Sequence, residues 1–293
     1  MPNKVLPRFK PDPIPAINPV PEVMAEGALL RVYEETKVGL GVPWMGVVAM
    51  SFAQYPKFYQ RLWSALEPIA LSSAFGDACA VLRQTAEAQA NELGPTTIVP
   101  RLGALGYTSQ NLAEINDCVE IFDGGNMPYL LMAALARLLL EGHHWTGEGQ
   151  VGSVSAPVQP PSRPVLMEEH HADPTLGAVY GDIKKVLGLP FVNTDYRALA
   201  RWPSYFALAW QELRPAIADP RYEGAVTAVH QRCVDLARDL PNATGLTPEA
   251  LREAAEQDAV SGEVLSVVQL FQWLLPGLAV NVSFLKAQVS DHT

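Results

Sequence analysis

The chain has 293 residues, of which 48% are hydrophobic and 18% are charged, a composition typical of a folded globular protein. Its formal net charge of -10 at pH 7 argues against a nucleic-acid partner, because phosphate contacts need a basic protein face. The three cysteines, Cys79, Cys118 and Cys233, lie in apolar helical patterns and form no CxxC pair. We expect them to pack in the core of a protein from a reducing compartment.

Residues 1–26 form a proline-rich N-terminal arm, with seven prolines before Glu22 and no apolar core of a signal peptide. Such a segment is expected to be extended and to lie over a surface, either of its own chain or of a partner. Charges are expected to interrupt the apolar runs that follow, which predicts that no helix spans a membrane. Together these features predict a cytoplasmic protein.

Helical periodicity dominates the rest of the chain, and strand signals are weak. Apolar residues recur every three or four positions from residue 56 to residue 71, and a second periodic segment ends at Gly94. A further helix is expected to begin near Pro128. Thr247 is expected to cap another helix. The sequence therefore predicts an all-α fold.

The second half of the chain matches the first at an offset of 147 residues without a gap. The matching pairs include Pro43 and Pro190, Pro56 and Pro203, Trp63 and Trp210, and Pro68 and Pro215. Agreement of three prolines and a tryptophan in one register predicts a tandem duplication that forms an intramolecular pseudo-dimer. Repeat 1 is expected at residues 27–144 and repeat 2 at residues 175–293, with a linker at residues 145–174.

The two repeats differ in chemistry at one stretch, where WMGVV of the first aligns with FVNTD of the second. Asp195 and Thr194 thus stand where the first repeat has Val48 and Val47. In a twofold arrangement both stretches would line one central cleft, with Asp195 as a functional carboxylate. The alternative is a plain helix start, in which Thr194 is the N-cap and Asp195 complements the helix dipole.

Asn126 follows Gly124 and Gly125 and precedes Pro128, a pattern that predicts a helix N-terminus. Free N–H groups at such an end favour an anion. The alternative is a turn with an asparagine cap.

Two histidine pairs, His143–His144 and His170–His171, flank the linker without metal-binding spacing. They are expected to be solvated, and no metal site is predicted. The sequence also lacks GxGxxG, P-loop and GxSxG motifs, so neither a nucleotide cofactor nor a serine nucleophile is indicated.

Three motifs resemble those of the group I 2-haloacid dehalogenases, the DehI-type family: VPWMGV from residue 42, GGNMPYLL from residue 124 and NTDYRALARWP from residue 193. The resemblance extends over nearly the whole chain after the arm. It implies a pseudo-dimer with the active site between the repeats, and a hydrolase acting on carbon–halide bonds without metal or cofactor. A 2-haloacid and water would be its small-molecule partners, and a homodimer is left open.

The resemblance also implies roles for individual residues. It places the catalytic aspartate at Asp195, a water-positioning asparagine at Asn126, and substrate-pocket residues at Trp44, Val47, Tyr129, Asn193 and Thr194. The aspartate would activate water for direct attack, which inverts C2.

Selectivity follows from two positions in the resemblance. Asn193 stands where non-stereoselective members have a small residue, and it favours D-(R)-substrates. Val47 stands where some members have a phenylalanine, so a wider, non-stereoselective pocket is one alternative. Two alternative functions are a non-catalytic all-α binding module and a peroxidase-like all-α enzyme that uses paired cysteines. The absence of a CxxC motif argues against the peroxidase.

Overall fold

The computed structural model describes residues 6–149, 151–153, 163–260 and 262–290, and these contain helices and no β-strand. The predicted all-α class is therefore confirmed. The helices are η1 (Glu22–Met24), α1 (Gly27–Leu40), α2 (Val47–Phe52), α3 (Pro56–Ala70), α4 (Ser73–Glu92), α5 (Val99–Ala104), α6 (Ser109–Leu140), η2 (Glu169–His171), α7 (Pro174–Leu187), α8 (Thr194–Leu199), α9 (Pro203–Ile217), α10 (Pro220–Asp239), α11 (Pro248–Glu256) and α12 (Glu263–Val289).

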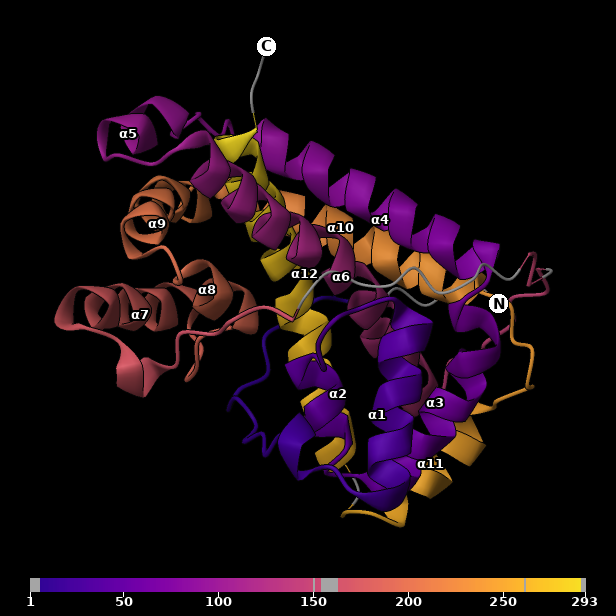
Figure 1. Ribbon diagram of the computed structural model, residues 1–293. Coiled ribbons are helices and arrows are strands. Elements are labelled where there is room, and N and C mark those ends of the chain that lie inside the picture. The colour runs from indigo at the N-terminus through magenta and orange to yellow at the C-terminus, as the bar shows by residue number, and fades with distance from the viewer. Residues whose placement is uncertain (1–5, 150, 154–162, 261, 291–293) are drawn as a thin grey trace.

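The long helices α6 and α12 pack against each other at the centre, with α4 and α10 beside them (Figure 1). On one side of this bundle lie α1, α2, α3 and α11, and on the other lie α5, α7, α8 and α9 (Figure 1). The C-terminal α11 packs on α3, while Arg101 of α5 pairs with Glu212 of α9. Each side is thus built from both halves of the chain.

The first four helices of each half have the same spacing. The bounds of α7 to α10 each lie 147 residues after those of α1 to α4, as Gly27–Leu40 and Pro174–Leu187 illustrate. Gly41 and Gly188 end α1 and α7 with φ of 66° and 63°, the left-handed region that glycine adopts without strain. Beyond α10 the spacing is lost, since α6 has 32 residues and α12 has 27.

Of the helix ends that the sequence predicted, those at Gly94 and Thr247 are confirmed and the one near Pro128 is not. Gly94 follows α4 with φ of 72°, and the Thr247 hydroxyl caps α11 by accepting from the Ala250 N–H, as predicted. The predicted helix start near Pro128 was wrong, because α6 runs unbroken through this point. Every residue from Asn126 to the end of α6 is buried, and this burial outweighs the one backbone hydrogen bond that proline removes.

Residues 6–21 of the arm contain no helix and lie across the chain's own helical bundle. Leu6 is 1% exposed, and its carbonyl oxygen is 2.7 Å from His230 Nε2 of α10. Arg137 of α6 donates to the Pro7 carbonyl at 2.9 Å. Residues 1–5 of the arm, and residues 150 and 154–162 of the predicted linker, lie outside the described residues.

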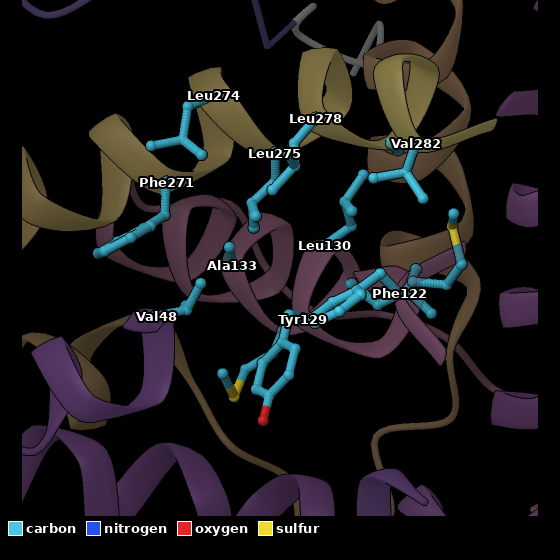
Figure 2. Packing of buried hydrophobic residues seen from close by; sticks show 14 of the residues in the cluster. Val48, Phe122, Tyr129, Leu130, Ala133, Phe271, Leu274, Leu275, Leu278 and Val282 are labelled. Carbon is cyan, nitrogen blue, oxygen red and sulfur yellow. The ribbon is translucent and has the colours of Figure 1, made fainter. Parts of the chain in front are cut away.

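Among the described helices, α12 is long and apolar enough to cross a membrane, with a mean hydropathy of 1.5. The expectation that charges interrupt every apolar run was therefore wrong here. Of that apolar window, 72% is buried inside the protein. Figure 2 shows Phe271, Leu274 and Leu275 of α12 facing α6, which is the packing of a core helix.

Candidate active site

The starts of α2 and α8 meet at one cavity of about 40 Å³. The first segment lines it with Trp44, Gly46, Val47 and Val48, the second with residues 191–195, α6 with Asn126 and Tyr129, and α12 with Phe271, Leu274, Leu275 and Leu278. The prediction that both aligned stretches line one cavity is confirmed. Apart from a few polar groups at one side, its walls are apolar, as in small-molecule sites generally.

Asp195 is the second residue of α8 and only 3% exposed. Asn126 Nδ2 donates a hydrogen bond to its Oδ1 at 2.6 Å. Burial raises the pKa of Asp195 to about 6, against the lowering effects of the Asn126 hydrogen bond and the Arg197 charge. At neutral pH this carboxylate is ionised, yet it is a stronger base than an exposed aspartate.

Asn126 lies inside α6, not at a helix N-terminus, and is 4% exposed. The predicted anion site at free N–H groups is therefore wrong at this position, because the helical hydrogen bonds continue through it. The side chain instead reaches Asp195 across the cavity. Since its amide nitrogen donates to the carboxylate, its amide oxygen is left to accept a hydrogen bond from a water.

Tyr129 stands one turn further along α6, and its ring lines the cavity. Its hydroxyl donates to the Trp44 carbonyl at 3.0 Å and accepts from the Gly46 N–H at 2.8 Å. A Cβ on Gly46 would lie 2.7 Å from the ring, so only glycine fits there. The hydroxyl thus holds the segment before α2, while the ring serves as a wall.

Trp44 packs its indole on Phe122 of α6, with ring centroids 4.8 Å apart. The indole also lies directly over Gly125, where an added Cβ would be 2.4 Å from Cη2. Gly125 thus permits a close approach of the indole to the backbone of α6. Val47, the first residue of α2, is half-buried and completes this wall.

Asn193 occupies the N-cap position of α8, which the plain helix-start interpretation had assigned to Thr194. Its side chain makes no capping hydrogen bond, and its buried Oδ1 has no hydrogen-bond partner among the described residues. Thr194 is the first helical residue, and its hydroxyl accepts from Arg197 Nη2 at 3.4 Å. Both side chains line the cavity beside Asp195.

Comparisons with known proteins point to one family. The family model described as "Halocarboxylic acid dehydrogenase DehI" matches residues 43–189. The chain is 46% identical over 240 residues to the (R)-2-haloacid dehalogenase of Rhizobium sp. (strain NHG3), which covers 81% of this chain and 93% of that protein. This chain belongs to the DehI family.

Two further relatives cover nearly the whole of this DehI-family chain. The (R)-2-haloacid dehalogenase of Pseudomonas putida is 36% identical over 278 residues, covering 93% of this chain and 92% of that protein. The solved complex of a D-2-haloacid dehalogenase with L-LA is 34% identical with a TM-score of 0.88, covering 97% of this chain and 99% of that one. The shared fold therefore extends over nearly the whole chain.

Sequence reasoning missed the α12 wall of the DehI-family site. The uncharged run from Val264 to Leu285 marks a core helix and was the one available signal. The histidine pairs do not line the cavity. Within the described ranges, no three His, Cys, Asp or Glu side chains are grouped as metal ligands.

Proposed function

We propose that this DehI-family chain hydrolyses short (R)-2-haloacids to 2-hydroxy acids, with the haloacid and water as its reactants. The observation that carries the proposal is the buried carboxylate of Asp195, held 2.6 Å from Asn126 in an apolar cavity. The two relatives named (R)-2-haloacid dehalogenase, at 46% and 36% identity, support the substrate class and its configuration.

In the proposed mechanism Asp195 is the general base. It takes a proton from a water that the Asn126 amide oxygen orients, and the oxygen attacks C2 from the side opposite the halogen. The new C–O bond forms as the carbon–halogen bond breaks, so the halide leaves with the bonding electrons and C2 inverts. An (R)-2-chloroacid then gives an (S)-2-hydroxy acid.

The remaining pocket residues are proposed to bind and orient the substrate. The Thr194 hydroxyl, which lines the cavity at the start of α8, would donate a hydrogen bond to the substrate carboxylate. The Gly46 N–H is not free for this role, because Tyr129 accepts its hydrogen bond. Trp44, Val47 and the Tyr129 ring are proposed to contact the halogen and the alkyl tail.

Stereoselectivity is proposed to depend on Asn193, which takes up room two residues before the base. Its side chain would block the in-line pose of the (S)-substrate, a difference of about 1–3 kcal/mol or roughly tenfold to a hundredfold in rate. Racemic 2-chloropropionate run to completion should release halide from half of the substrate and leave the (S)-enantiomer. Consumption of both enantiomers at similar rates would favour the wider, non-stereoselective pocket that Val47 suggests.

The experiment that tests the activity is halide release by the wild type and by Asp195→Asn. The variant should retain the fold and lose turnover, since asparagine cannot take up the proton. A single turnover in oxygen-18 water should place the label in the product. Unlabelled product would instead indicate that Asp195 attacks C2 itself. If the wild type released no halide, the alternative of a non-catalytic binding module would be favoured.

We also propose that the fold arose by tandem duplication into a pseudo-dimer, with the arm, repeats and linker at residues 1–26, 27–144, 145–174 and 175–293. The constant spacing of 147 residues between α1–α4 and α7–α10 supports this division. So does the pairing of α2 and α8 at one cavity.

Three further expectations are proposed with their tests. EDTA should leave halide release unchanged, because the mechanism uses no metal or cofactor. Light scattering will test the homodimer, and fractionation of cells will test the cytoplasmic location.

A further inference from the structure

A larger cavity of about 460 Å³, here called the vestibule, adjoins the active-site cavity. Asn193, Leu274 and Leu278 line both spaces, so a single layer of side chains separates them. The outer wall of the vestibule comes from the N-terminal arm, through Arg8, Phe9 and Lys10. The arm therefore covers the approach to Asp195 from this side.

The arm places two cations in the vestibule wall. Arg8 and Lys10 lie over the Trp273 ring, at 5.4 Å and 5.3 Å from its centroid. Arg8 also donates to the Trp273 carbonyl at 3.0 Å and pairs with Glu223 at 2.6 Å. Glu223 is the one carboxylate among the residues lining the vestibule, and because Arg8 neutralises it, the charge of Lys10 remains.

The Lys10 side chain lies at the carboxyl end of α7. Its Nζ lies only 2.3 Å from where a Cβ on Gly188 would be, so the ammonium group rests on the glycine that ends this helix. The negative end of the helix dipole favours a cation in this position. The positive charge thus lies beside the vestibule, although the chain as a whole carries a net charge of -10.

The other large cavity, of about 670 Å³, has the opposite character. It contains Glu114, Asp117 and Glu120 against Arg163 and Arg201, and it shares no lining residue with the active-site cavity. Its carboxylates outnumber its two arginines, so this cavity attracts an anion less than the vestibule does.

We propose that the vestibule is the route by which the carboxylate substrate reaches Asp195, and that Lys10 on the arm draws the anion into it. This inference rests on the proposed function, because it assumes that the ligand is a small carboxylate. A cation beside a low-dielectric passage raises the local concentration of an anion and its rate of association. Arg8 acts differently, by fastening the arm through Trp273 and Glu223.

The test is the Lys10→Gln variant, with Lys57→Gln as the matched control. Lys57 is exposed on α3 and lines neither cavity, so its replacement changes the net charge equally. At low ionic strength Lys10→Gln should lower kcat/KM about threefold to tenfold through KM, with kcat unchanged, and Lys10→Glu should lower it further. Added salt should reduce kcat/KM of the wild type more than that of Lys10→Gln.

A second readout needs no turnover: the association rate of L-lactate, followed by tryptophan fluorescence in stopped flow. It should fall in Lys10→Gln and not in Lys57→Gln. If the wild type releases halide normally while both variants match it in kcat/KM and in lactate association, the vestibule proposal is wrong. If the wild type releases no halide but lactate association still depends on Lys10, the proposed function fails and the carboxylate route stands.

Discussion

At the residue scale, Asp195 gains its basicity from burial in a cavity whose walls are mostly apolar. Its pKa is raised to about 6 because water cannot solvate the carboxylate there, and the Asn126 hydrogen bond limits the rise. A base of this strength is still ionised at neutral pH and accepts a proton more readily than an exposed aspartate does. Burial thus sets the strength of the proposed base, and the contact with Asn126 fixes its orientation and moderates its pKa.

The pH dependence of catalysis should report this pKa. Because Asp195 must be ionised, kcat/KM should rise about tenfold per pH unit below pH 6 and level off above it. Asn126→Ala removes a hydrogen bond that lowers the pKa, so the inflection should move to higher pH and kcat should fall more than KM rises. Tyr129→Phe removes a bond that does not touch Asp195 and should leave the inflection in place. If the pH profile of kcat/KM were unshifted in Asn126→Ala, Asn126 would contribute to packing and not to the pKa of Asp195.

The same burial should make Asp195 costly for stability. Its folded pKa of about 6 lies above the ordinary value of 3.8, so the ionised carboxylate destabilises the folded state in full above pH 6. This destabilisation decreases as the pH falls from 6 toward 3.8. Asp195→Asn should therefore raise the free energy of unfolding by roughly 2–3 kcal/mol at pH 7. Urea unfolding should show this gain shrinking at pH 5. A gain of equal size at both pH values would point to packing instead of charge.

At the element scale, α6 carries two adjacent glycines with different neighbours. A Cβ on Gly125 would lie 2.4 Å from the Trp44 indole, whereas a Cβ on Gly124 would meet only Arg83 Nη1 at 3.7 Å. Both sites are helical, where alanine is intrinsically preferred over glycine. Alanine substitutions at these two glycines therefore distinguish the effect of helix propensity, expected at Gly124, from the effect of packing against Trp44, expected at Gly125.

Gly124→Ala should stabilise the protein by about 0.5–1 kcal/mol and leave kinetics unchanged. Gly125→Ala should push Trp44 away from α6, lower the free energy of unfolding by about 1–3 kcal/mol and raise KM. Urea unfolding and halide-release kinetics on both variants provide the comparison. If the two substitutions behaved alike, Trp44 would not depend on this glycine for its position.

At the scale of the whole molecule, the arm is fastened to the bundle through buried polar groups. His230 of α10 contacts the Leu6 carbonyl and the Gln272 side chain of α12. Burial lowers the pKa of His230 to about 4, with the charges of Arg137 and Arg8 adding to the effect. The arm is therefore held by a neutral histidine between two central helices.

Protonation of His230 should couple pH to the stability of the fold. Its folded pKa of about 4 lies below the ordinary 6.5, so its contribution is complete above pH 6.5 and is lost as the pH falls from 6.5 to 4. The loss should approach roughly 3 kcal/mol. Asp195 has the opposite pH dependence in this range, and His230→Gln retains it. The measurement is therefore the difference in the free energy of unfolding between wild type and His230→Gln, from urea unfolding at pH 7 and at pH 5. A difference that does not change with pH would contradict the prediction.

The sequence alone determined the features that depend on near neighbours, together with the internal repeat, which appears when the chain is compared with itself. Helical periodicity specified the all-α class, glycine and threonine marked the ends of α4 and α11, and the offset of 147 residues singled out Asp195 opposite Val48. Caps, helix hydrogen bonds and side-chain periodicity are local, so the order of residues is enough to read them.

Only the tertiary structure decided the features that depend on contacts between distant segments. Local signals placed Asn126 at a helix start, but its burial in the bundle keeps α6 continuous and brings its amide to Asp195. The α12 wall and the course of the arm likewise follow from packing between segments far apart in the chain. Burial of apolar surface and desolvation of charges are set by what surrounds a group in space, and no short stretch of sequence contains that information.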